Sequence, residues 1–374
     1  MKRWNRHIER WLLGSMQMLL LMVSMLMLVA CADDDDNVSG GAIDEPQSNQ
    51  LRLSSATREG ETTTPAYLAE GNIKVYVTVT SKDEPIFTGL FSKNSSDAIW
   101  NSSNLAIKEN TQYYLYGYMP NTVSGTLVKP VGGDFSGGAT LTLSDLPVFS
   151  DEDIRVIVGV QRVTDNSTFT AATEGTFGYL SGASSQNYVN LLMGHLYSQL
   201  QLRFCVDKTY YALRRIHLKS VTLKSTYVPK DDKITATVNL QDGKGLKGQV
   251  VFSDPVATTP DTPEEWPLLT DGNQELVVEP EDNAGNPVYT VLPNTVNCLY
   301  RLFDTNGTYL TLECSYDVYD TEGNKVRENC TATNKVKVSS MAPGVRKTLT
   351  LTVTPTYLYV LSDDDLNNPT IVIN

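Results

Sequence analysis

Short stretches in which apolar and polar residues alternate constrain the fold of this chain more than any other feature. In one of them, Ile73, Val75 and Val77 are separated by Lys74 and Tyr76. The same alternation of apolar and polar residues occurs at residues 154–158, 196–206 and 347–353. A period of two puts every second side chain on one face of an extended strand. These segments are therefore predicted to be half-buried β-strands.

Turn signals separate the alternating stretches. They are Gly132-Gly133-Asp134, Gly137-Gly138, Asp242-Gly243, Asp271-Gly272-Asn273, Asn306-Gly307 and Glu322-Gly323-Asn324. The last one lies between residues 309–319 and 325–338 and predicts a β-hairpin. Helical periodicity is almost absent, since only residues 208–215 could form two turns at most. Many short strands with regular turns are typical of sandwiches and barrels, so the predicted fold class is all-β.

The length of the chain, 374 residues, suits two domains better than one. A stretch rich in Gly and Ser, residues 179–186, lies near the middle, and we place the boundary close to Val189. The predicted domains are an N-terminal β-sandwich at residues 59–189 and a C-terminal β-sandwich at residues 190–356.

The N-terminus has the pattern of an export signal, because bases precede an apolar run over residues 12–30. Leu28-Val29-Ala30-Cys31 resembles a bacterial lipobox. In such signals the bond between Ala30 and Cys31 is cut, and Cys31 carries a diacylglycerol thioether. Residues 1–30 are then a lipoprotein signal peptide, and acyl chains anchor the protein by about 0.8 kcal/mol per buried CH₂. An uncleaved transmembrane anchor is the alternative, because the run is nearly long enough to span a bilayer.

An acidic segment follows the predicted lipid site. Asp33, Asp34, Asp35 and Asp36 repel one another, so we expect a solvated, extended tether. A lipidated Cys followed by acids also resembles the surface-export signal of lipoproteins in some Gram-negative anaerobes. The whole chain has a net charge of −13 and no basic stripe, which argues against nucleic acid as a partner.

The remaining cysteines are Cys205, Cys298, Cys314 and Cys330. Export makes a disulfide among them permissible, and buried free thiols are the alternative. No CxxC motif occurs, and His195 and His217 are the only histidines after the leader, so a zinc site is not predicted. We expect no metal and no cofactor.

Catalytic motifs are also missing, because the chain has no GxSxG elbow and no HExxH. His195 is predicted to be an ordinary packed histidine. Asp363, Asp365 and Asn367 have the first spacings of a calcium loop, but Asn368 stands where that loop needs Gly. The aromatic run at residues 113–118 could stack on sugars, although a strand would divide its rings between core and surface. The sequence therefore predicts a protein that is not an enzyme.

Taken in order, four features resemble the fimbrillins, the subunits of type V pili. The first is the lipobox. The second is Tyr113-Tyr114-Leu115-Tyr116-Gly117-Tyr118-Met119-Pro120, similar to a strand of the family's first domain. The third is Leu192-Met193-Gly194-His195-Leu196-Tyr197-Ser198-Gln199-Leu200-Gln201-Leu202-Arg203-Phe204, which resembles the entry to the second domain, with Ser198 where the family often has Ala. The fourth is a C-terminal tail after the last sandwich strand.

The resemblance implies two tandem transthyretin-like β-sandwich domains and a maturation step. After lipidation and export to the outer membrane, an Arg-specific protease cuts ahead of the first domain. The removed segment had filled a groove, and a strand of another pilin subunit replaces it by β-augmentation. Here residues 31–58 form the tether and propeptide strand, in which Leu51 and Leu53 alternate. The bond between Arg58 and Glu59 is the expected maturation site, and Arg52 is the fallback.

The tail, residues 357–374, is expected to supply the donor strand through Tyr357, Tyr359, Leu361, Ile371 and Ile373. The alternative is that it pairs with its own C-terminal domain. The leading functional hypothesis is a shaft or tip subunit of a surface pilus that supports adhesion, with a host or bacterial surface receptor as a further partner. Two alternatives stay open: a pilus anchor that keeps its N-terminal strand, and a surface lipoprotein that binds glycans.

Overall fold

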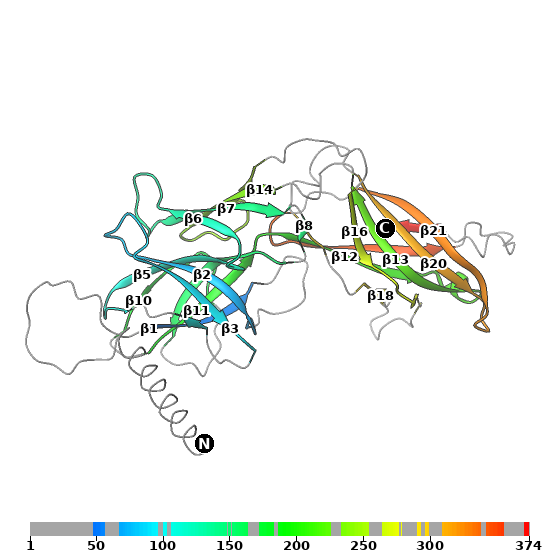
Figure 1. Ribbon diagram of the computed structural model, residues 1–374, viewed down its shortest axis with the longest axis horizontal. Coiled ribbons are helices and arrows are strands. Elements are labelled where there is room, and N and C mark those ends of the chain that lie inside the picture. The colour runs from blue at the N-terminus through cyan, green and yellow to red at the C-terminus, as the bar shows by residue number, and fades with distance from the viewer. Residues whose placement is uncertain are drawn as a thin grey trace, which may run out of the picture. The chain divides into compact units, whose positions relative to one another are not determined.

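A computed structural model of the chain describes residues 48–56, 67–95, 100–102, 106–147, 149–150, 152–163, 172–182, 186–225, 233–253, 264–276, 278, 290–292, 296–298, 309–337, 342–354 and 370–373. Residues 45–374 form a compact unit of their own. The regular structure described is nearly all β-strand, which confirms the predicted all-β class (Figure 1).

The largest sheet has eight strands and contains most of the first half of the chain. Its order is β1 (Ser48–Ser55), β11 (Gln186–His195), β9 (Arg155–Val163), β5 (Gln112–Met119), β2 (Gly71–Thr78), β3 (Phe87–Lys93) and β4 (Asn101–Ser102), and β10 (Gly178–Leu180) pairs with β5. β1 runs parallel to β11, whereas the other strands of this sheet pair antiparallel.

Both faces of this sheet carry buried side chains, as β2 illustrates. Ile73, Val75 and Val77 lie in one hydrophobic core together with residues of β1, β5, β9 and β11. Tyr76, which points to the other face, is only 6% exposed and belongs to a second core. The sheet therefore separates two cores, and the described residues of one of them all belong to this sheet and to the segments next to its strands.

A four-stranded sheet shares the second core. Its order is β15 (Val250–Phe252), β14 (Lys233–Gln241), β7 (Gly138–Pro147) and β6 (Ser124–Val128). Two tyrosine hydroxyls of the large sheet reach this part of the chain. Tyr76 donates to the Gly125 carbonyl in β6 at 2.7 Å, and Tyr116 donates at 2.6 Å to the carbonyl of Phe135, which lies between β6 and β7. These bonds satisfy hydroxyl groups that would otherwise be buried without partners.

Two further sheets come mainly from the second half of the chain. The six-stranded sheet has the order β23 (Thr370–Ile373), β22 (Arg346–Thr354), β12 (Ser198–Val206), β19 (Val296–Cys298) and β8 (Phe149–Ser150), with β18 (Thr290–Val291) paired to β12. The five-stranded sheet has the order β16 (Glu264–Leu269), β13 (Arg215–Ser225), β20 (Tyr309–Tyr319) and β21 (Lys325–Lys337), with β17 (Gln274–Leu276) paired to β13. Their apolar faces join the second core.

Local signals account for several of these elements. β20 and β21 form the hairpin predicted across Glu322-Gly323-Asn324, where Gly323 has a φ of 87°. The only helix among the described residues is α2 (Lys208–Tyr211), inside the segment predicted to hold two turns at most. Asp207 caps it by accepting bonds from the amides of Thr209 and Tyr210.

Strand pairing differs from the expected domain boundary in two places. Val189 and Asn190 both lie inside β11, whose ladder with β9 continues to His195. β14, from the second half of the chain, pairs with β7 from the first half over residues 233–241. If the boundary is drawn by sheet membership, it follows His195, and β14 and β15 belong with the first half of the chain. The division into two domains stays a proposal.

The described thiols are free. Cys205 is half-buried, whereas Cys314 and Cys330 are buried. Cys314 pairs with Ala332 and Cys330 with Tyr316, so the two thiols are diagonal neighbours on adjacent strands. Diagonal positions place Cα atoms about 7–8 Å apart, beyond the usual span of a disulfide. The side chain of Cys298 lies outside the described residues, and a disulfide that involves it stays a prediction.

Candidate functional site

The candidate site is the place that β1 occupies in the eight-stranded sheet. β1 has the sequence SNQLRLSS, and its central leucines, Leu51 and Leu53, are 0% exposed. All eight residues of β1 pair in register with residues 186–193 of β11. Burial of one leucine side chain contributes about 1.5–3 kcal/mol, so these two make β1 a substantial part of the core.

β1 also has partners along its other side. The Trp100 amide donates to the Leu51 carbonyl at 3.1 Å, and the Leu68 amide donates to the Leu53 carbonyl at 2.8 Å. Trp100 directly precedes β4, the last strand in the sheet order, and forms an isolated antiparallel bridge with Leu51. The first and last strands of the sheet therefore meet at this point, and β1 closes the sheet around the core that contains Leu51 and Leu53.

The indole of Trp100 depends on a glycine for its position. Trp100 is 2% exposed, and a Cβ placed on Gly71 would lie 3.2 Å from its Cη2 and 2.8 Å from Cε of Met119. Gly71 also has a φ of +141°, which residues with a side chain rarely adopt. The start of β2 thus leaves room for the ring that meets β1.

Polar side chains hold β1 at its beginning. Asn49 is 6% exposed, and its Oδ1 accepts a hydrogen bond from the Tyr179 hydroxyl. Burial raises the pKa of Tyr179, which keeps the phenol protonated as a donor. Near the other end, Ser54 Oγ donates to the Leu191 carbonyl at 3.3 Å. Neither bond would be expected from a flexible tether.

A charged cluster holds the end of β1. His195 is 5% exposed; its Nδ1 lies 2.7 Å from Asp153 Oδ2, and its Nε2 lies 2.9 Å from the Ala56 carbonyl oxygen. A carboxylate and a carbonyl both accept, so each ring nitrogen donates to its neighbouring oxygen in the tautomer that places a proton on it. Arg155 Nε donates to the same Asp153 oxygen at 2.9 Å. The Ala56 amide in turn donates to the Met193 carbonyl at 2.9 Å.

The contacts of His195 resemble those in a Ser–His–Asp triad. Its Nε2 lies 3.0 Å from Ser55 Oγ, and its Nδ1 faces Asp153. The Ala56 carbonyl argues against that chemistry. When Nε2 donates to this carbonyl, it has no lone pair with which to take a proton from Ser55. The arrangement is better suited to holding the chain than to nucleophilic catalysis.

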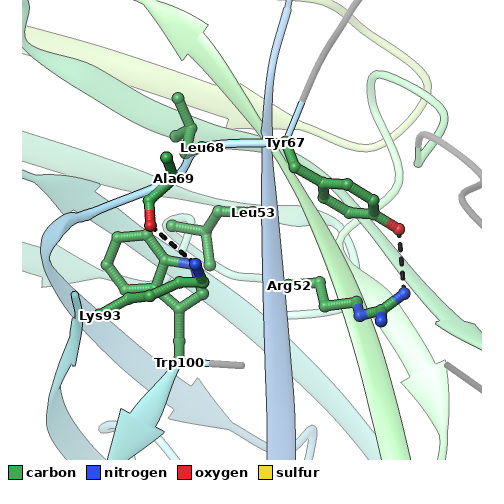
Figure 2. A pocket seen from close by; sticks show the side chains of 7 residues that line it. All are labelled: Arg52, Leu53, Tyr67, Leu68, Ala69, Lys93 and Trp100. Carbon is green, nitrogen blue, oxygen red and sulfur yellow. Dashed lines mark hydrogen bonds between the residues drawn. The ribbon is translucent and has the colours of Figure 1, made fainter. Parts of the chain in front are cut away.

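A pocket of about 240 Å³ lies beside β1 on the side of Trp100, and we call it the seam pocket (Figure 2). Its lining consists of Arg52, Leu53, Tyr67, Leu68, Ala69, Lys93 and Trp100. Arg52 Nη1 donates to the Tyr67 hydroxyl at 3.1 Å, and its guanidinium lies 5.3 Å from the centre of that ring. Lys93 Nζ donates to the Ala69 carbonyl at 2.7 Å. No acidic residue is among the described residues that line it.

Several predicted site residues lie outside the described residues: Ala30, Cys31, Arg58, Glu59, Tyr357, Tyr359 and Leu361. Arg52 is described and lies inside β1. Ile371 and Ile373 lie in β23, where they pair with Val353 and Leu351 of β22 in the same chain. In the isolated chain the end of the tail thus follows the alternative that the sequence left open, and donation of the tail stays a proposal.

Sequence reasoning missed two parts of this site. Trp100 joins the two ends of the sheet, and nothing in its sequence context predicts that role. His195 was expected to be an ordinary packed histidine, but it connects β1 to Asp153. No local pattern signals either role, because both depend on contacts between distant segments.

Two further properties concern the described part of the chain. None of its helices is long and apolar enough to cross a membrane. Within the same residues, no group of three His, Cys, Asp or Glu side chains is arranged to hold a metal ion.

No family model matches the chain. No curated protein matches it either. Among solved structures, it is similar to a fimbrial protein from Bacteroides vulgatus ATCC 8482, with 14% identity, a TM-score of 0.42 and coverage of 87% of this chain and 98% of that one. A proposed cell adhesion protein from Bacteroides ovatus ATCC 8483 has 10% identity, a TM-score of 0.38 and coverage of 88% and 96%. A proposed adhesin from Bacteroides thetaiotaomicron VPI-5482 has 10% identity, a TM-score of 0.34 and coverage of 89% and 98%. Similarity at this level carries no argument about the function of this chain.

Proposed function

We propose that this chain is a structural subunit, shaft or tip, of a cell-surface pilus that supports adhesion. It is exported as an outer-membrane lipoprotein whose lipid is attached to Cys31. It polymerises by donor-strand exchange after a protease removes β1. One observation carries the proposal: β1 precedes the expected cleavage site at Arg58 and contributes two fully buried leucines to a core that it closes. A subunit without β1 would have an open core and an unpaired β11 edge, which a strand of matching pattern could fill.

The two arginines near β1 are not equivalent as protease sites. Arg52 lies in the middle of β1, and its flanking residues Leu51 and Leu53 both accept backbone hydrogen bonds from outside the strand. A protease needs an extended and accessible segment, which a strand paired on both sides does not offer. Arg58 follows the end of β1 and leaves the strand intact as a fragment. These positions favour Arg58.

The tail is the proposed donor. Among the described residues, β23 lies at the edge of its sheet and pairs with β22 alone, over four residues. A short edge strand exchanges partners more easily than a central one, because fewer main-chain bonds must break. The period of two at Ile371 and Ile373 matches that of Leu51 and Leu53, so the tail can present two apolar side chains to the vacated core.

The alternative roles differ in how well they fit. A pilus anchor would keep β1, and the extensive contacts of β1 fit a strand that is retained as well as one that is removed. A glycan-binding protein would present exposed aromatic rings. The rings of the aromatic run are largely buried, with Tyr113 3% exposed and Tyr116 and Tyr118 0% exposed. We therefore place glycan binding last.

The deciding experiment compares Arg58→Gln with Arg52→Gln in a bacterium that assembles the chain into surface fibres. N-terminal sequencing of assembled wild-type material should begin at Glu59. Arg58→Gln should retain β1 and fail to polymerise, whereas Arg52→Gln should mature normally. If assembled protein still begins at Cys31, the anchor role replaces the proposal. If Arg52→Gln alone blocks assembly, cleavage occurs inside β1.

A further inference from the structure

One face of β1 is apolar in its middle and polar at both ends. Asn49, Leu51, Leu53 and Ser55 alternate along the strand and therefore share this face. The two leucines are 0% exposed, whereas Asn49 and Ser55 each meet a side chain of the same sheet. A strand that shifted by one residue would turn this whole face away from the core. The two polar contacts can therefore fix the register of a strand in this place.

Tyr179, in β10, makes the contact at the beginning of β1. Its hydroxyl donates to Asn49 Oδ1, and its ring stacks on that of Tyr113 with the ring centres 5.9 Å apart. Tyr179 is 4% exposed, so this packing holds the hydroxyl at one position. Any strand in the place of β1 covers the hydroxyl, and a buried hydroxyl without an acceptor is unfavourable. The site of Asn49 therefore selects a side chain that accepts a hydrogen bond.

His195, at the end of β11, makes the contact at the other end. Its Nε2 lies 3.0 Å from Ser55 Oγ, and its Nδ1 lies 2.7 Å from Asp153 Oδ2. Asp153 belongs to the segment before β9, so it orients the imidazole whether or not β1 is present. The imidazole is 5% exposed and needs a polar partner when a strand covers it. The site of Ser55 therefore selects a small polar side chain.

We propose that Tyr179 and His195 set the register of the strand that occupies the place of β1, by selecting an acceptor and a hydroxyl six residues apart with two aliphatic residues between them. In the assembled fibre, this strand is residues 356–362 of a second copy of the chain. The identity of the donor rests on the proposed function. The role of the two side chains in holding β1 does not.

The sequence of the tail supports this donor, although residues 356–362 lie outside the described residues. Four of them repeat the pattern of β1 at the same spacing, with a hydroxyl acceptor, two aliphatic residues and a serine. They are Thr356, Leu358, Val360 and Ser362. The site of Leu51 again receives a leucine, and the site of Leu53 receives the slightly smaller valine. A packed core tolerates such nearly volume-conserving exchanges best.

The other apolar faces of the tail fit this place less well. If Ile371 and Ile373 took the leucine sites, Pro369 would stand at the first polar site, with no acceptor in its side chain and no amide hydrogen. If Tyr359 and Leu361 took them, a tyrosine ring would replace a leucine that is 0% exposed. Overpacking of that kind is destabilising. A period of two alone does not choose between these segments, and the polar ends do.

The donor differs from β1 at one buried site. Leu361 takes the place of Ser54, which is 1% exposed and forms an isolated bridge with Tyr67. Tyr67 is 40% exposed, so a shift of its segment toward solvent makes room for the larger side chain.

The contact at the beginning of β1 is tested on β1 itself. The test uses residues 45–374, which form a compact unit, with a specific protease site built in after Arg58. After the cut, mass spectrometry follows release of the β1 fragment. Asn49→Leu should speed release at least about fivefold, and in Tyr179→Phe its effect should shrink to within about twofold. Gln50→Ala, on the other face of the strand, should release at the wild-type rate. No effect of Asn49→Leu, or an equal effect in both backgrounds, overturns the role of Tyr179.

The contact at the end of β1 is tested with the same cut unit. Ser55→Ala should speed release at least about threefold, and His195→Leu should remove most of that difference, because the partner of the hydroxyl is gone. A Ser55→Ala effect of the same size in both backgrounds, or no effect at all, overturns the role of His195.

Disulfide trapping then measures the register of the donor. Leu51 pairs with Val189 of β11, and neighbouring strands lie about 4.8 Å apart, within the span of a disulfide. A synthetic peptide of residues 355–363 should displace the β1 fragment from the cut unit. Val189→Cys should trap the peptide that carries Leu358→Cys and not the one that carries Tyr359→Cys. Trapping of Tyr359→Cys instead overturns the proposed register.

Failure of the donor is distinguishable from failure of the two contacts. If the peptide does not displace β1 while both release experiments give the expected results, the tail is not the donor, and the proposed route of polymerisation is contradicted. The roles of Tyr179 and His195 in holding β1 then stand.

Discussion

The backbone amide of Trp100 donates a 3.1 Å hydrogen bond to the carbonyl of Leu51, and this bond joins the two ends of the eight-stranded sheet. Leu51 belongs to β1, which precedes the expected protease site, and Trp100 directly precedes β4. A segment that is expected to be removed thus closes the sheet. The energetics of β1 then decide how stable the uncut chain is and how open the cut chain becomes.

Truncation of a β1 leucine should destabilise the uncut chain. Leu53→Ala leaves a cavity in a closed core, and we expect the free energy of unfolding to fall by about 2–5 kcal/mol. Gln50→Ala, in the same strand, changes a partly exposed side chain and should stay within about 0.5 kcal/mol of wild type. Urea unfolding of both variants measures the difference. Equal stabilities would show that β1 does not belong to the folded core.

Removal of the His195 imidazole should loosen β1 without unfolding the protein. His195→Leu deletes the bonds to Asp153 and to the Ala56 carbonyl. Hydrogen bonds to charged groups are worth about 1.5–3 kcal/mol, which corresponds to an increase in amide exchange of roughly ten- to a hundredfold in residues 48–56.

Hydrogen exchange with mass spectrometry checks this prediction. His217→Leu is the matched control: it removes a histidine of β13 that contacts Asn273, and it should leave exchange in β1 unchanged. Exchange in β1 that is the same in wild type and in His195→Leu would contradict the role of His195.

Deletion of residues 357–374 tests the tail. In protein already cut after Arg58, the deletion should abolish polymer formation and leave the thermal midpoint of the monomer within a few degrees. The reason is that β23 adds only a four-residue edge strand to its own sheet. A large fall in the midpoint of the monomer would instead assign the tail to its own fold, and the donor-strand proposal would fail.

Lipidation has a direct test. Cys31→Ala should lose fatty-acid label and membrane association, because the thioether is the only attachment that the lipobox provides. Cys205→Ala, in β12, should keep both. Label that persists in Cys31→Ala would refute the lipobox.

Alkaline pH should destabilise the C-terminal sheets. Burial raises the pKa of Cys314 from 9.0 to about 12 and that of Tyr316 from 10.0 to about 12. A raised pKa in the fold means that the neutral group contributes its full stability below the unfolded pKa. That contribution is lost as pH rises through the folded value. We therefore expect stability to fall between about pH 9 and 12.

Urea unfolding at several pH values in reducing buffer measures this loss. Cys314→Ala should flatten the alkaline slope, because the titrating thiol is gone. Ser315→Ala changes a neighbour that does not titrate in this range and should lower stability by the same amount at every pH. An unchanged slope in Cys314→Ala would contradict the assignment.

The sequence by itself determined the class of the fold and many of its strands. Alternation placed β2, β9 and β22 within a few residues, and Glu322-Gly323-Asn324 placed the hairpin of β20 and β21. These features are local: period two fixes which side chains share a face, and a Gly with a positive φ fixes a tight turn. For the same reason the alternation of Leu51 and Leu53 could be identified as part of a strand, whereas a groove that this strand fills is what the resemblance implies.

Tertiary structure alone decided the partners. Alternation states which face of a strand is apolar and not which strand lies beside it, so it could not pair β1 with β11 or β14 with β7. The contact of His195 with Ser55 spans 140 residues of chain, and the bridge from Leu51 to Trp100 closes a sheet whose order no local pattern records. Such pairings depend on how much apolar surface the whole chain buries. That area is defined only once all the strands are in place.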